Sequence, residues 1–169
     1  MAEAVEIVDW VLVPGTPADI ETVARQCRRL VNKRALLAAG VAVVPVPGLD
    51  WLTDVGVLLQ LIPEINRSFG LTPEQIERLA PQRRVVVYKA ISAGGGLLLG
   101  KLVTRELVLN ALKVVGVRLT TQQAAKYVPV AGQAVSALLT YSALRFVCEQ
   151  HIRQCMDVAR QLALPAPAR

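Results

Sequence analysis

The sequence predicts an all-α protein, a single-domain bundle of about six or seven helices built around two helical hairpins with Pro/Gly turns. Apolar residues recur at helical spacing in almost every segment, and helix-capping residues separate the segments. A length of 169 residues suits one domain with its own core. We expect that domain to span residues 1–163, with 1–15 as a short N-terminal helix or arm and 164–169 as a disordered Pro/Ala tail.

The first long helix is expected to begin after Thr16, which is typical of an N-cap and is followed by Pro17 and by Asp19 in the first turn. One side of this helix is apolar, with Ile20, Val23, Ala24, Cys27, Leu30 and Val31. Its other side is basic, with Arg25, Arg28, Arg29, Lys33 and Arg34. The helix is expected to continue to about Val44.

The first Pro/Gly turn contains Pro45, Pro47 and Gly48, which cannot continue a helix. Asp50 is then expected to cap an apolar helix that ends at Gly70, with Asp54 also near its positive N-terminal end. Pro63 predicts a kink within that helix.

The second half of the chain repeats these signals. Thr72 to Gln75 predicts a capped short helix that ends near Leu79. Helices are expected over 82–101, 104–115 and 120–126, although 83–88 and 114–117 also have the β-branched content of strands. A second turn contains Pro129 and Gly132 and leads into a long terminal helix, Gln133–Leu162.

The composition indicates an excess of apolar surface, because 53% of the residues are hydrophobic and only 19% are charged. No stretch has the roughly 20 consecutive apolar residues that a spanning helix needs. Small residues at four-residue spacing instead favour close helix packing. These are Ser92, Gly96 and Gly100 in one helix, and Gly132 and Ser136 in another.

The net charge of +6 is concentrated in two segments, residues 25–48 and 81–126. Nucleic acid is not expected as a partner, because aromatic residues for base stacking are nearly missing from both segments. An anionic membrane surface or an acidic protein explains the charge equally well.

Catalytic and metal chemistry have little support. Residues 95–101 have the spacing of a phosphate-binding loop, but Leu102 stands where a hydroxyl should hold magnesium. Cys148, His151 and Cys155 share a helix face and are suitable zinc ligands, yet we expect two buried thiols beside a partly exposed histidine. We therefore predict no enzyme, no metal and no cofactor. Three sparse cysteines and an acidic start without a signal sequence predict a cytoplasmic protein.

The segment from Val44 to Asp50, Asp54, and the Phe69–Leu71 sequence resemble the YcjF-like bacterial family of unknown function, which is related in pattern to the helical domain of immunity-related GTPases. The second turn and the helix after it resemble the same family's second hairpin. The resemblance implies an all-α module that is often membrane-associated and often linked to a GTPase, with no catalysis of its own.

The predicted function is therefore a non-enzymatic module that attaches peripherally to an anionic membrane, on the cytoplasmic face of the inner membrane, or docks on a membrane-associated partner. Its contact residues are expected to be Arg25, Arg28, Arg29, Lys33 and Arg34. Two alternatives remain open, a soluble homo-oligomeric scaffold that buries its apolar helix faces between subunits and a carrier of an apolar ligand.

Overall fold

The structure, a computed structural model, describes residues 13–42, 49–94 and 132–163 together with residues 104, 106, 108 and 110. The helices are α1 (Pro17–Ala42), α2 (Leu49–Ser68), α3 (Pro73–Glu77), α4 (Pro81–Gly94) and α6 (Gly132–Ala163). No strand occurs in these ranges, so the all-α prediction is confirmed for them. The predicted turns at Pro45, Pro47, Gly48 and Pro129, the packing residues Gly96 and Gly100, and residues 1–12 of the predicted arm 1–15 lie outside the described residues.

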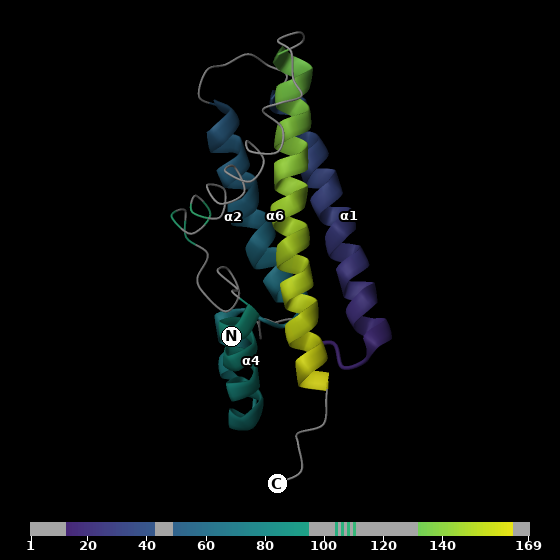
Figure 1. The fold of residues 1–169 in the computed structure, drawn as a ribbon, viewed down its shortest axis with the longest axis vertical. Coiled ribbons are helices and arrows are strands. Elements are labelled where there is room, and N and C mark those ends of the chain that lie inside the picture. The colour runs from purple at the N-terminus through teal and green to yellow at the C-terminus, as the bar shows by residue number, and fades with distance from the viewer. Residues whose placement is uncertain are drawn as a thin grey trace, which may run out of the picture.

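Three long helices lie side by side and make the body of the fold (Figure 1). The chain runs in opposite directions in α1 and α2, and α6 is antiparallel to α1. The most extensive contact joins α1 to α6, while α4 packs against α6 at one end of the body. Consequently α6 touches each of the other long helices as well as α4.

The contact between α1 and α6 is built from small and branched side chains at spacings of three and four residues. The predicted apolar side of α1 is confirmed, because Ile20, Ala24, Cys27 and Val31 are buried and the same pattern continues to Ala38. The buried side of α6 follows the same rule with Leu144, Cys148, Ile152, Cys155, Ala159 and Leu162. Alternating three- and four-residue steps keep one seam of a helix against its neighbour, and the alanines and cysteines allow close approach.

The ends of the helices follow the capping chemistry of the sequence. The Thr16 hydroxyl accepts a hydrogen bond from the backbone N–H of Asp19 at 3.2 Å, so Thr16 is the N-cap of α1. α2 ends where Gly70 adopts a φ of 70°, with Gly70 N–H donating to Arg67 and Leu71 N–H to Asn66. This Schellman motif requires a left-handed residue, which only glycine adopts without strain. Thr72 and Gln75 then form the predicted capping box of α3.

The strand alternative for residues 83–88 is wrong, because these residues lie within α4. Arg84 donates to the backbone carbonyls of Glu77 and Leu79 and so fixes the junction of α3 and α4. Val87 and Ala90 then face the core one turn apart. Helical packing along one face has therefore overridden the β-branched content.

Candidate functional site

The predicted basic side of α1 divides into two groups with different surroundings. Arg28 and Arg34 reach neighbouring helices, whereas Arg25, Arg29 and Lys33 are exposed. The five residues that the sequence placed together therefore do not form a single free surface.

Arg28 connects α1 to α6 through a two-pronged ion pair with Glu149. Its Nε and Nη2 atoms donate to the two carboxylate oxygens of Glu149, each at 3.0 Å, and its Nη1 atom donates to Glu21 at 3.2 Å. The hydrogen bonds from Arg28 lower the pKa of Glu149 below its ordinary value, and those to Glu149 raise the pKa of Arg28. Parallel N–H···O bonds of this kind fix orientation as well as charge.

Arg34 connects α1 to α2. Its Nη1 atom donates to the side-chain oxygen of Gln60 at 2.7 Å, and its Nη2 atom lies 3.5 Å from a carboxylate oxygen of Glu64. Arg28 and Arg34 thus hold α1 against its two neighbours from either side of the buried seam.

The outer face of α1, which we define as Arg25, Arg29, Lys33, Leu36 and Leu37, is directed away from the core. At about 100° per residue, Arg25, Leu36, Arg29 and Lys33 fall within an arc of about 80°, opposite the buried seam. Leu36 and Leu37 are 61% and 63% exposed, which is unusual for adjacent leucines in a protein that buries 26 hydrophobic side chains within its described residues. A basic row therefore leads directly into an apolar pair on one exposed helix surface.

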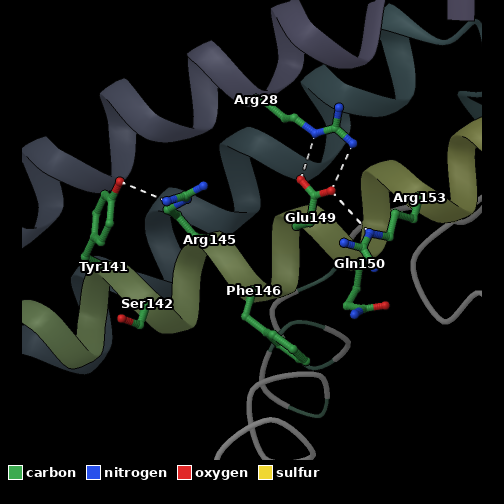
Figure 2. A pocket seen from close by; sticks show the side chains of 8 residues that line it. All are labelled: Arg28, Tyr141, Ser142, Arg145, Phe146, Glu149, Gln150 and Arg153. Carbon is green, nitrogen blue, oxygen red and sulfur yellow. Dashed lines mark hydrogen bonds and ion pairs between the residues drawn. The ribbon is translucent and has the colours of Figure 1, made fainter. Parts of the chain in front are cut away.

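A second surface feature is a groove along α6, with a volume of about 640 Å³ (Figure 2). It is lined by Arg28, Tyr141, Ser142, Arg145, Phe146, Glu149, Gln150 and Arg153. Seven of these residues come from α6 and one from α1, so α6 forms the floor and Arg28 stands at one side. Arg145 lies over the ring of Tyr141, 5.5 Å from its centroid, and Glu149 also accepts a bond from Arg153 at 3.2 Å.

This groove was not predicted from the sequence, although a signal was present. Tyr141, Arg145, Glu149 and Arg153 follow one another at four-residue steps and therefore share one side of a helix. What the sequence lacked was the partner on α1, because Arg28 and Glu149 are 121 residues apart.

A buried polar cluster joins α2 to α6 inside the bundle. The Nε2 atom of His151 lies 2.6 Å from the side-chain oxygen of Asn66, and both residues are 2% exposed. An amide oxygen only accepts, so Nε2 carries the proton and Nδ1 is left as an acceptor. Burial lowers the pKa of His151 to about 4, so its neutral form predominates near pH 7.

The prediction of a partly exposed histidine is therefore wrong, because α2 covers the face of α6 that carries His151. The prediction of two buried thiols is confirmed, since Cys148 and Cys155 are both buried; Cys27 is buried as well, and none of the three forms a disulfide. Burial raises the pKa of Cys148 to about 12 and that of Cys155 well above its ordinary value. Across the described ranges, no three or more His, Cys, Asp or Glu side chains are arranged to hold a metal ion.

The remaining predicted residues occupy helices. α2 begins at Leu49, one residue before Asp50, so Asp50 and Asp54 both lie within its first two turns. Gly132 is the first residue of α6 and Ser136 follows one turn later. Ser92 is exposed, and its hydroxyl donates to the carbonyl of Tyr88 within α4 at 2.9 Å. Ser92 therefore does not make a close helix contact among the described residues.

None of the helices within the described ranges combines the length and hydropathy that a bilayer span requires. The chain matches no protein-family model, no curated protein and no solved structure. The resemblance to the YcjF-like family accordingly stays a prediction.

Proposed function

We propose that the protein is a non-enzymatic helical module that attaches peripherally to an anionic membrane surface through the outer face of α1. The observation that carries this proposal is the arrangement of three exposed cations and two exposed leucines on the side of α1 opposite the core. In this proposal the protein is a single-domain bundle with two helical hairpins, and it lies on the cytoplasmic face of a membrane.

The chemistry of the outer face suits the headgroup region of a bilayer. Each basic residue near an anionic surface contributes about 1 kcal/mol, and Leu36 and Leu37 add apolar area that can enter the boundary with the acyl chains. Arg28 and Arg34 contribute less to attachment because their charges are already paired within the protein. Attachment through three cations should be reversible and should weaken as salt screens the charges.

Self-association through the same face is the rival proposal, favoured by the exposure of Leu36 and Leu37. It would bring Arg25, Arg29 and Lys33 of two copies close together around a symmetry axis. Like charges in one interface oppose association unless carboxylates interleave with them. A membrane surface or an acidic membrane-associated protein, such as a GTPase partner, meets no such repulsion.

Vesicle sedimentation tests the proposal. We expect the protein to sediment with phosphatidylcholine vesicles that contain phosphatidylserine, and not with phosphatidylcholine vesicles alone. The variant R25E/R29E/K33E should lose this binding, and L36S/L37S should weaken it at any salt concentration. A charge-matched control, R67E/R83E/K89E, changes three exposed basic residues on α2 and α4 and should retain binding to a large extent.

Equal loss of binding in the control and the outer-face variant would show that only net charge matters, and would contradict a defined contact. Absence of vesicle binding at low salt would exclude the membrane proposal altogether. Light scattering on the same variants separates the rival, since a dimer that L36S/L37S disrupts would favour self-association.

A further inference from the structure

The groove along α6 shares no residue with the outer face of α1, and its chemistry is also different. Among the described residues, Arg28 is the only one from α1 that lines it, and α6 supplies the others over three helical turns from Tyr141 to Arg153 (Figure 2). The groove is therefore elongated along a helix axis, a shape that suits another helix laid alongside.

The charges in the groove are only partly neutralised. Arg28 donates two hydrogen bonds to the carboxylate of Glu149, and Glu149 also accepts a hydrogen bond from Arg153. Arg145 is exposed and, within the part of the chain that the structure describes, forms no ion pair with a carboxylate. Arg153 is 63% exposed, so most of its donors face solvent. The groove thus presents two guanidinium groups on either side of an occupied carboxylate.

Five of the eight side chains that line the groove are of types enriched at protein interfaces. Among the described residues it contains three arginines, one tyrosine and one phenylalanine, and no lysine. Arginine and aromatic residues are over-represented at protein–protein contacts, whereas lysine is depleted there. Arg145 is held over the ring of Tyr141, which reduces the side-chain freedom that it would lose on binding. Phe146 adds an exposed apolar side chain to the lining of the groove.

We propose that this groove binds an acidic helical segment of a partner protein. Arg145 and Arg153 are eight residues apart, about 12 Å along α6 at 1.5 Å per residue. A helix that carries two carboxylates two turns apart matches that separation, with an apolar residue placed against Phe146. The proposal does not depend on membrane attachment, because the two surfaces share none of the residues that would bind.

Binding of a defined peptide tests the proposal on the full-length protein. The probe is a fluorescein-labelled, alanine-based helical peptide with two glutamates eight residues apart and a phenylalanine between them on the same side. We expect saturable binding by fluorescence anisotropy. The variant R145E/R153E should weaken it at least tenfold, and F146A should weaken it several-fold. The variant R67E/R83E, which changes the same number of exposed arginines on α2 and α4, should leave the affinity within about twofold, because neither residue lines the groove.

A peptide of opposite charge tests the same contact with the charges of the two partners reversed. With lysines in place of the two glutamates, the peptide should bind R145E/R153E more tightly than it binds the wild type. Circular dichroism of each variant checks that the fold is retained. The proposal is overturned if the acidic peptide shows no saturable binding to the wild type or binds R145E/R153E equally well. It is also overturned if R145E/R153E reduces binding to anionic vesicles or to an RNA oligonucleotide while peptide binding is unchanged.

Discussion

The inner and outer faces of α1 differ more than their sequences suggest. Ala35 is fully buried, while its neighbour Leu36 is 61% exposed, so the larger hydrophobic residue is the one in contact with solvent. Arg28 is similarly tied to Glu149, while its neighbour Arg29 is exposed. A rotation of about 100° about the helix axis separates each pair. Position around the helix, rather than residue type, therefore decides which side chains hold the fold and which are available to a partner.

The largest expected effect comes from enlarging a buried side chain on the inner face of α1. A35L should destabilise the protein by about 3 kcal/mol, because the closely packed interior has no room for three further carbon atoms. L36A on the outer face should change stability by less than about 0.5 kcal/mol. Urea unfolding followed by circular dichroism measures both. Similar losses in the two variants would mean that Leu36 is buried in solution against a second copy.

The polar cluster inside the bundle should make stability depend on pH. His151 has a folded pKa of about 4, below its ordinary 6.5. The unfolded chain therefore takes up a proton at a pH where the folded protein does not. Stability is complete above pH 6.5 and should fall by about 1.4 kcal/mol per pH unit as the pH drops toward 4, or about 2 kcal/mol between pH 6.5 and 5. Urea titrations at pH 7 and pH 5 measure this difference.

H151Q is the matched control for that prediction. Its side-chain amide retains a donor for the oxygen of Asn66 but does not titrate, so the loss between pH 7 and pH 5 should nearly vanish. Glu149 does not affect the difference between pH 7 and pH 5. Its pKa is lowered in the folded protein, so its contribution to stability is lost only at more acidic pH. An unchanged pH profile in H151Q would show that another group causes the loss.

Features that depend on neighbouring residues could be predicted from the sequence, whereas contacts between distant helices could not. Local signals, such as the Thr16 cap, Gly70 and the Thr72 capping box, depend on residues within one or two turns and were predicted correctly. Contacts across long sequence separations were not. His151 was placed partly in solvent because nothing near it in sequence reveals Asn66, which is 85 residues away. The basic side of α1 was treated as one surface because the carboxylates that occupy Arg28 and Arg34 belong to α6 and α2.

A smaller difference in stability is expected between variants of Arg28, which is ion-paired to α6, and of Arg29 on the outer face. R28Q should destabilise the protein by about 1 kcal/mol, because it removes a two-pronged bond to Glu149 that is only partly shielded from solvent. R29Q, one residue away on the outer side, should cost less than about 0.5 kcal/mol. The difference should diminish in 1 M salt. A double-mutant cycle with E149Q isolates the interaction, and a coupling energy near zero would mean that the pair contributes orientation only.

Replacing Gly40 should have the smallest effect on stability, and it should stabilise the protein instead of destabilising it. Gly40 is exposed within α1, lies on the same side as Arg29 and Lys33, and a Cβ atom built there would meet nothing within 4 Å. G40A should therefore stabilise the protein by about 0.5 kcal/mol, because alanine restricts the unfolded chain and favours helix. Unfolding midpoints at two protein concentrations measure the gain. A loss that grows with concentration would mean that a second copy approaches this backbone closely, and the outer face of α1 would then belong to a protein interface instead of a membrane.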